Sequence, residues 1–225
     1  MFKFVFLDTD DTILDFLKTE HNAIARTFRE FGLDPTEDVI SRYSAVNLSC
    51  WERFERGELT REQVMIVRFE EFFAELGVNI DPHECDRRYC VHLGEEHIFV
   101  EGAEEMLNYL APKYHLYIAS NGFAETQEPR LESAGIVHYF DEIFISERTG
   151  FHKPEKGFFD YCFARIPDFR REEAIIIGDS LSSDIQGGIN AGIATCWFNL
   201  RRKPARDDIT PDYTIYDLEE LKKIL

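Results

Sequence analysis

The chain has 225 residues, of which 44% are hydrophobic and 20 are phenylalanine, enough apolar material for one large core or for one core with a smaller second unit. Such a composition excludes a chain that stays unfolded. The 25 basic and 43 acidic residues give a net charge of −18, which excludes a nucleic-acid polymer or an anionic membrane as a favoured partner.

The first predicted element is a strand over Phe2–Leu7, buried on both faces because nearly all of its side chains are apolar. Asp8 follows at its carboxyl end, the edge where ligands bind in an open parallel sheet, and Asp10 comes two residues later. Both carboxylates can reach one pocket there, and a shared Mg²⁺ would relieve their repulsion. The alternative for this segment is an ordinary acidic loop.

Residues 15–100 have helical periodicity and no clear strand pattern. Thr60 and Gln63 can form a capping box, and Asp81 before Pro82 is typical of a helix start. Helices are expected over His21–Phe31, over Thr36–Phe54, from Thr60, and over Asp81–Leu93. The block is therefore predicted to be an all-helical insert.

From Glu101 onward the pattern changes to alternating helices and strands. Helices are expected over Ala103–Leu110, Glu125–Ala134, Pro154–Phe163, Leu181–Ala191 and from Leu218. Strands are expected over His115–Ala119, Glu142–Ile145, Ala174–Gly178, Ile193–Phe198 and Tyr213–Ile215. This alternation implies parallel strands with right-handed crossovers. We predict an α/β fold in which residues 1–14 and 101–225 form a Rossmann-like, three-layer parallel-sheet core and residues 15–100 form a helical cap.

Two segments after predicted strands carry groups that can bind phosphate. Ser120-Asn121-Gly122 offers a hydroxyl and loop N–H groups, although an ordinary strand-to-helix turn would look the same. Lys153 directly precedes a proline, and its amine could keep a carboxylate nucleophile ionised and neutralise phosphate. An acidic chain that binds an anionic substrate needs such a local positive charge.

A second acidic pair follows the isoleucine-rich strand. Asp179 sits at the strand end, and Asp184 lies about one helical turn further on. A helix N-cap would explain one of the two carboxylates but not both. Clustered hard oxygen ligands select Mg²⁺ over Zn²⁺. The nearby basic run Arg201-Arg202-Lys203 with Arg206 is either a solvated loop or a phosphate-attracting rim.

In their order and on these strands, the segments resemble the four motifs of the haloacid dehalogenase superfamily of phosphohydrolases: Asp8-x-Asp10-x-Thr12, Ser120, Lys153-Pro154, and Gly178-Asp179 with Asp184. The likeness spans essentially the whole chain. The sequence departs from the usual pattern at Asp11, where glycine is common. Aspartate tolerates the left-handed backbone better than most residues, so we expect the turn to persist.

The resemblance implies a mechanism. Asp8 would attack phosphorus to form an aspartyl-phosphate, with Asp10 as acid and then base. Thr12 and Ser120 would position phosphate oxygens, and Lys153 would link nucleophile and phosphate. Asn121 and Gly122 are further candidates for the phosphate site. The metal site implied for Mg²⁺ consists of Asp8, the backbone carbonyl of Asp10, Asp179 and, nearby or through water, Asp184.

A narrower likeness points to the pyrimidine 5′-nucleotidase branch. It rests on Asp10-Asp11-Thr12, Asn47, Trp51-Glu52, Gly57-Glu58, Ser120-Asn121-Gly122-Phe123, Thr126-Gln127 and Arg130-Leu131. It implies a small-molecule phosphate monoester as substrate, a pyrimidine nucleoside 5′-monophosphate above others. Phe16, Asn47, Trp51 and Phe123 are candidates for the substrate-facing surface, although each could simply be a packing residue.

Several alternatives stay open. Asp10 argues against dehalogenation, because displacement of halide needs no proton donor there. A phosphatase for sugar phosphates or other small metabolites, or a phosphomutase, would use the same four segments. A phosphate-responsive binding module is the non-enzymatic alternative, against which the Asp8/Asp10 pair argues.

The sequence also carries expectations about compartment. No run of about 18 apolar residues could span a membrane, and no basic leader precedes the first strand. The five cysteines are odd in number and lack CxxC spacing, which is typical of reduced thiols. We expect a cytoplasmic protein with no membrane partner, either a monomer or a homodimer.

Overall fold

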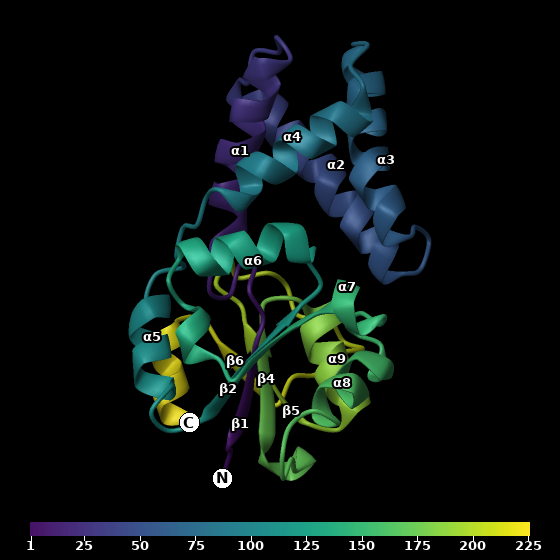
Figure 1. Ribbon diagram of the computed structural model, residues 1–225. Coiled ribbons are helices and arrows are strands. Elements are labelled where there is room, and N and C mark those ends of the chain that lie inside the picture. The colour runs from purple at the N-terminus through teal and green to yellow at the C-terminus, as the bar shows by residue number, and fades with distance from the viewer.

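A six-stranded parallel sheet forms the centre of the protein (Figure 1) in the computed structural model, which describes residues 1–225. The strand order is β3-β2-β1-β4-β5-β6. The strands are β1 Phe4–Leu7, β2 His115–Ser120, β3 Glu142–Ile145, β4 Ala174–Gly178, β5 Ala194–Phe198 and β6 Tyr213–Ile215. The predicted α/β fold with a parallel sheet is confirmed.

Strand β1 occupies the middle of the sheet because all four of its residues are buried. It pairs with β2 on one side and with β4 on the other, so that Phe4 faces both His115 and Ala174. Connections run to β2 and β3 on one side and to β4, β5 and β6 on the other. The loops after β1 and β4 therefore diverge and leave room for a ligand at the carboxyl ends of these strands.

Helices cover both faces of the sheet and complete three layers (Figure 1). The residues of β1 alternate between the layers: Val5 packs against α5 and the C-terminal turn, whereas Phe6 packs against α8. The helices are α5 Ala103–Leu110, α6 Ala124–Ser133, α7 Ser146–Thr149, α8 Lys156–Phe163 and α9 Gln186–Ala191, with a 3₁₀ turn at Leu218–Lys223. Short 3₁₀ turns also lie at Val137–Tyr139 and Arg171–Glu173.

Four further helices lie between β1 and α5, where the sequence predicts an all-helical block. They are α1 Phe16–Glu30, α2 Glu37–Glu55, α3 Arg61–Leu76 and α4 Pro82–Gly94. The predicted capping box is present, with Gln63 N donating to Thr60 Oγ1 at 3.3 Å and Thr60 N donating to Gln63 Oε1 at 2.7 Å. Asp81 caps α4, again as predicted.

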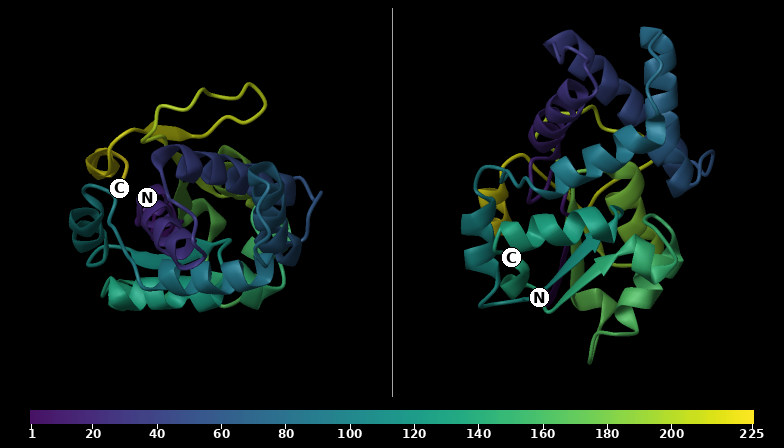
Figure 2. Two further views of the ribbon diagram at one scale, coloured as in Figure 1. Left: turned by 90° about the horizontal axis from the view of Figure 1, so that it is seen from above. Right: turned by 45° about the horizontal axis from the view of Figure 1, so that its top comes forward.

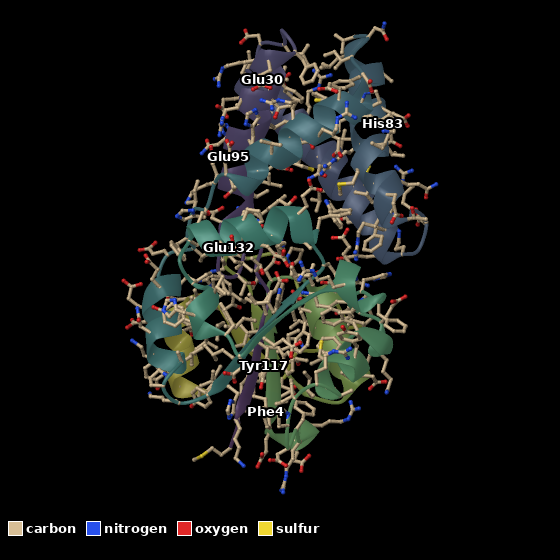
Figure 3. All side chains as sticks on the ribbon, viewed as in Figure 1. Phe4, Glu30, His83, Glu95, Tyr117 and Glu132 are labelled. Carbon is tan, nitrogen blue, oxygen red and sulfur yellow. The ribbon has the colours of Figure 1, made fainter.

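These four helices have an aromatic core of their own. Phe28 stacks on Phe72 with ring centroids 5.5 Å apart, and Tyr43 packs against both Phe69 and Tyr89. In Figure 3, Phe4 and Tyr117 lie in the sheet layer, far from this upper group of helices. The separate core supports the view of residues 15–100 as a cap, but its role as a specificity lid stays a prediction.

The helical group lies over the carboxyl end of the sheet (Figures 1 and 2). Helix α4 packs along α6, where a Cβ on Gly94 would lie 3.8 Å from the Cβ of Pro129. At the C-terminal end of α2, Ser182 Oγ donates to Glu55 Oε2 at 2.5 Å, and the centroid of the Phe54 ring lies 4.4 Å from that of the His152 ring. The carboxyl edge of the sheet is therefore covered at both ends of the helical layer.

Helix α1 begins at Phe16, five residues before the predicted start at His21, because Asp15 caps it by accepting a bond from Lys18 N at 3.2 Å. Strand β1 begins at Phe4 and not at the predicted Phe2. Three later elements also differ from the sequence prediction. The helix predicted from Pro154 begins at Lys156, because residues 152–155 form a turn in which Glu155 N donates to the carbonyl of His152. The helix predicted from Leu181 opens as a π-helical turn over Leu181–Ile185. The last predicted helix is a 3₁₀ turn. None of the helices is long and apolar enough to cross a membrane.

Candidate active site

Asp8 stands at the carboxyl end of β1, as predicted. Its backbone N–H donates to the carbonyl of Ile177 at 3.0 Å, which continues the pairing with β4 and fixes the direction of the side chain. The side chain is largely buried, and Lys153 Nζ donates to its Oδ1 at 2.6 Å. A buried carboxylate is thus held against a buried amine at the edge where ligands bind.

Lys153 reaches this position through its backbone. Asn121 binds it twice: Lys153 N donates to Asn121 Oδ1 at 2.8 Å, and Asn121 Nδ2 donates to the Lys153 carbonyl at 2.9 Å. The amine, 1% exposed, also donates to Asp184 Oδ1 at 2.6 Å and to the carbonyl of Ala119. The side chain of Asn121, predicted to lie in the phosphate site, is therefore occupied in orienting the lysine.

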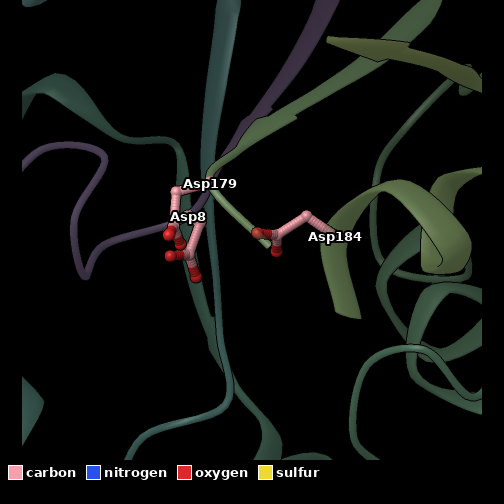
Figure 4. A group of neighbouring side chains, drawn as sticks. All are labelled: Asp8, Asp179 and Asp184. Atoms are coloured by element: carbon pink, nitrogen blue, oxygen red, sulfur yellow. The ribbon is translucent and has the colours of Figure 1, made fainter. Parts of the chain in front are cut away.

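Asp8, Asp179 and Asp184 converge (Figure 4), and one carboxylate oxygen from each lies within 4.8 Å of the others. A Cβ on Gly178 would lie 2.7 Å from the Cβ of Asp184, so only glycine lets that aspartate come so close to β4. Ser180 N donates to Asp184 Oδ2 at 3.1 Å and holds it there. Three hard oxygen donors in this arrangement fit Mg²⁺.

The titration behaviour of this cluster reflects burial first and the charges of neighbouring groups second. Burial raises the pKa of Asp8 well above its usual range, against the effect of Lys153, and raises the pKa of Asp179 to about 6. Burial alone would lower the pKa of Lys153, but Asp184 and Asp8 outweigh it and raise that pKa. Lys153 pairs with Asp8 and Asp184, whereas Asp179 pairs with the partly exposed Lys203. Three carboxylates thus face two amines, and a divalent cation would correct that imbalance.

Asp10 belongs to a different set of contacts. Gln127 Nε2 donates to its Oδ2 at 2.5 Å, and Arg130 Nη1 donates to its Oδ1 at 2.6 Å. Its carboxylate is not part of the convergent cluster of three, so any share of Asp10 in the metal site falls to its backbone carbonyl. That backbone contact stays a prediction.

The other predicted phosphate-site residues lie around these groups. Ser120 is almost fully buried, and its Oγ accepts a bond from Gly122 N at 3.1 Å. Thr12 is fully buried, and its hydroxyl has no hydrogen-bond partner. Ser120 is thus the last residue of β2, and Gly122 lies in the loop that follows it. Their contacts with phosphate stay predictions, as does that of Thr12.

Residues 5–198 match the family described as haloacid dehalogenase-like hydrolase. The chain belongs to the haloacid dehalogenase-like hydrolases.

Relatives of this haloacid dehalogenase-like hydrolase cover nearly the whole chain. It is 41% identical to the HAD-hydrolase YfnB of Bacillus subtilis (strain 168), over 100% of this chain and 95% of that protein. It is 33% identical to two pyrimidine 5′-nucleotidases over 98% of this chain: PynA of Streptococcus pneumoniae (strain ATCC BAA-255 / R6) and YjjG of Escherichia coli (strain K12), covering 93% and 96% of those proteins. The crystal structure of YfnB bound to magnesium matches with a TM-score of 0.96 over 100% of this chain and 98% of that chain.

Asp11 shows how this haloacid dehalogenase-like hydrolase tolerates its departure from glycine. Its φ is 56°, the predicted left-handed conformation. Its Oδ1 accepts bonds from Phe16 N at 3.0 Å, at the start of α1, and from Arg201 Nη2 at 2.8 Å. The side chain that replaces glycine therefore ties the first helix of the upper layer to the loop after β5.

The basic run after β5 is neither wholly solvated nor wholly part of the site. Arg201 and Lys203 are partly exposed, yet Arg201 reaches Asp11 and Lys203 Nζ reaches Asp179 Oδ2 at 2.8 Å. Arg202, by contrast, lies over the exposed ring of Tyr216. These different contacts cannot be predicted from the sequence, because neighbouring residues of one loop point in different directions.

The four candidates for the substrate-facing surface lie in different surroundings. Asn47 is buried, and both polar atoms of its side-chain amide are engaged: Nδ2 donates to Glu20 Oε1 at 2.6 Å, and Oδ1 accepts from Arg68 Nη1 at 3.2 Å. Trp51 packs edge-on against Phe54, Phe123 lies beside the Arg61 guanidinium, and Phe16 lies beside that of Arg130. All four stay predictions, with Asn47 the least free to bind a substrate.

Sequence reasoning assigned no role to Gln127 and Arg130, although both stand in the motif compared with the nucleotidase branch. Their signal was their spacing: three residues apart on a helix, both lie on one face of α6. That face meets Asp10 across more than 110 residues of chain, which no local pattern reveals.

Proposed function

We propose that this protein is a Mg²⁺-dependent phosphomonoester hydrolase that works through an aspartyl-phosphate and prefers pyrimidine nucleoside 5′-monophosphates. The observation that carries the proposal is the contact of Asp8 with the Lys153 amine at 2.6 Å, beside the convergent carboxylates of Asp179 and Asp184. A nucleophile, a fixed positive charge and a cation site thus share one point at the sheet edge. That combination suits attack on a phosphate dianion.

In the first step, an Asp8 oxygen forms a bond to phosphorus while the bond from phosphorus to the ester oxygen breaks. Asp10 gives its proton to the departing oxygen, which leaves as an alcohol. Lys153 holds Asp8 in place and offsets the negative charge that gathers on the phosphoryl oxygens. The product is an aspartyl-phosphate, and Asp10 is left as a carboxylate.

In the second step, Asp10 takes a proton from a water molecule as the water oxygen bonds to phosphorus. The bond between phosphorus and the Asp8 oxygen breaks, so inorganic phosphate is released and both carboxyl groups return to their starting states. Mg²⁺, which Asp8, Asp179 and Asp184 would hold, supplies charge neutralisation between the anionic nucleophile and the phosphate.

The choice of a nucleotide as substrate rests on relatives and on the covered site. PynA and YjjG, which are described as pyrimidine 5′-nucleotidases, resemble the whole chain, including the four upper helices. Those helices lie over the sheet edge, where they can contact the part of a substrate beyond its phosphate (Figure 2). We further infer that the protein works in the cytoplasm, in line with its five free thiols.

A phosphate-release screen tests the proposal. Purified protein with MgCl₂ should release phosphate from uridine and thymidine 5′-monophosphates faster than from purine nucleotides or sugar phosphates, without a bisphosphate activator. A preference for sugar phosphates would overturn the nucleotidase assignment, and dependence on a bisphosphate would indicate a mutase. Failure to hydrolyse even 4-nitrophenyl phosphate would overturn the phosphatase assignment and favour a phosphate-binding module.

A further inference from the structure

We propose that Arg130 and Gln127 are positioning residues that hold Asp10 in line for proton transfer. The inference rests on the proposed function, because it assigns to these two residues a part in the acid and base work of Asp10. The two side chains grip both oxygens of one carboxylate: Arg130 Nη1 binds Oδ1 at 2.6 Å, and Gln127 Nε2 binds Oδ2 at 2.5 Å. A carboxylate bound at both oxygens has little freedom to rotate.

Gln127 and Arg130 together form a clamp on Asp10, and they also bind each other. Gln127 Oε1 accepts a bond from Arg130 Nη1 at 3.2 Å, so the two residues support each other from successive turns of α6. A Cβ on Gly122 would lie 2.7 Å from Gln127 Cγ, so the glycine of the phosphate-site loop leaves room for this side chain. The position of Asp10 is therefore set by α6 and by the loop that follows β2.

The burial of Arg130 is poorly explained by stability. Its side chain is 0% exposed, and its Nε and Nη2 have no hydrogen-bond partner, while the Asp10 side chain is 30% exposed. A guanidinium buried with unmet donors costs free energy, and a buried ion pair is weak evidence for stabilisation. An arginine retained at such a cost beside the predicted acid and base is better explained by what it does to that carboxylate.

The clamp also lies where helices α1–α4 meet the part of the molecule that contains the sheet. The Arg130 guanidinium lies 5.8 Å from the ring of Phe16, the first residue of α1. Helix α6, which carries the clamp, packs along α4. The packing of helices α1–α4 against α6 therefore affects the orientation of Asp10.

Two substrates separate positioning of Asp10 from general damage. A nucleoside 5′-monophosphate has a poor leaving group, so its ester oxygen needs the Asp10 proton as the bond to phosphorus breaks. From 4-nitrophenyl phosphate the nitrophenolate departs without a proton. Hydrolysis of the aspartyl-phosphate needs Asp10 as base with either substrate. A misplaced Asp10 thus slows both steps for the nucleotide but only the second step for the aryl ester.

The experiment compares Arg130→Met and Gln127→Leu with wild type, in single-turnover and burst kinetics on uridine 5′-monophosphate and 4-nitrophenyl phosphate. We expect Arg130→Met to slow the nucleotide by about 10- to 100-fold, the size of a small misplacement. With the aryl ester it should give a burst of about one nitrophenolate per site, followed by slow turnover. Gln127→Leu should do the same to a smaller extent, and Asp10→Asn sets the upper limit, a loss of roughly 10²–10⁴.

The matched control is Arg148→Met. Arg148, in α7, pairs at 2.5 Å with Glu128 of α6, the helix that carries Arg130, but it is 62% exposed and does not touch Asp10. It should leave both substrates unaffected. Equal loss of the first step for both substrates in Arg130→Met and Gln127→Leu would reduce the clamp to a structural role, and wild-type behaviour would overturn the inference outright. A low folded fraction lowers burst amplitudes but not the ratio of first-step rates. A wild type that hydrolyses neither ester would instead overturn the proposed function, and the inference with it.

Discussion

At the scale of single residues, two carboxylates only two positions apart have opposite surroundings. Asp8 is buried against Lys153 and two other acidic side chains, whereas Asp10 is partly exposed and bound by Arg130 and Gln127. Under the proposed mechanism, environments that differ in this way suit two chemically identical groups to different tasks, one as nucleophile and one as acid and base. Asp8 directly follows the last residue of β1, and Asp10 lies in the loop beyond it, so their side chains reach different surroundings.

The first prediction concerns Asp8. Asp8→Asn should abolish turnover and covalent phosphorylation of the protein, because an amide oxygen is far too weak a nucleophile at phosphorus. The fold should survive, since burial already disfavours the charged form of Asp8. Phosphate release and incorporation of label from a radioactive substrate measure the first effect, and circular dichroism with thermal unfolding measures the second. Retained turnover in a folded variant would reject Asp8 as the nucleophile.

The sequence predicts residues of the site better than it predicts their partners. Asp8, Lys153, Asp179 and Asp184 follow strands of a recognisable parallel sheet, so their convergence could be anticipated. The grip of Arg130 on Asp10 could not, because it joins positions 120 residues apart through a helix face. The role of Asn121 was likewise missed, since its bonds to the Lys153 backbone depend on two loops meeting in space.

At the scale of elements, the fold follows from hydrophobic pattern and turn chemistry, and its exceptions lie at the site. Helices α3 and α4, whose capping residues stand out in the sequence, begin where it predicts, whereas α1, which Asp15 caps, begins five residues before the predicted His21. The turn over Leu181–Ile185 widens into a π-helix at the point where Asp184 folds back to the Ser180 N–H and to Lys153. Local helix propensity cannot predict this turn, because the turn is accompanied by a contact with a lysine that is distant in the sequence.

Gly178 tests how closely that turn must approach the sheet. Gly178→Ala should place a methyl group 2.7 Å from the Asp184 Cβ and push the carboxylate out of the cluster. Overpacking of this kind lowers the free energy of unfolding by about 1–3 kcal/mol, and Mg²⁺ affinity should fall with it. Urea unfolding and Mg²⁺ titration calorimetry measure the two effects.

The control for this change is Gly157→Ala. Its methyl group would meet the Phe151 ring, which is exposed and can swing away, so neither stability nor Mg²⁺ affinity should drop. Equal behaviour of the two alanine variants would show that Gly178 does not set the position of Asp184.

The junction of α1 and α2 carries a prediction about pH. Burial raises the pKa of Glu20 above its ordinary value of 4.5, and bonds from Ser44 and Asn47 oppose the rise. The folded state therefore binds this proton more tightly than the unfolded state does. Its contribution to stability is fully present below pH 4.5 and is lost as pH rises through the folded-state pKa.

Glu20→Gln should remove this loss, so the variant gains in stability relative to wild type as pH rises above 4.5. Ser44→Ala should act in the opposite direction, because it removes a bond that holds the Glu20 pKa down. Urea unfolding of the three proteins between pH 4 and 7 gives the comparison. A difference between Glu20→Gln and wild type that stays constant with pH would contradict the prediction.

At the scale of the whole molecule, a chain of net charge −18 must bind an anion without repelling it. Carboxylates such as Glu30, Glu95 and Glu132 lie on the outside of the helices (Figure 3), while the side chains of Lys153 and Arg130 are buried. Each of these two cations is already paired with a carboxylate, so the site keeps an excess of negative charge that a bound divalent cation would offset at short range.

This arrangement predicts that Mg²⁺ stabilises the entire fold and not only the site. A ligand that binds only the folded state at 100 times its Kd adds about 2.7 kcal/mol to the free energy of unfolding. Asp184→Asn should lose most of this gain, because its carboxylate is one of the three that converge. Thermal unfolding with and without MgCl₂ measures the gain directly.

Ionic strength has to be held constant with NaCl in that measurement, because so acidic a chain gains stability from screening by any salt. Asp160→Asn provides the matched control: it removes an exposed carboxylate on α8 that pairs with Lys156 and Arg171 and is not one of the three convergent carboxylates, so it should keep the full Mg²⁺ effect. If MgCl₂ and NaCl of equal ionic strength stabilised the wild type equally, or if Asp184→Asn responded like Asp160→Asn, the ion would be acting on the general acidic surface. The three convergent aspartates would then not be its site.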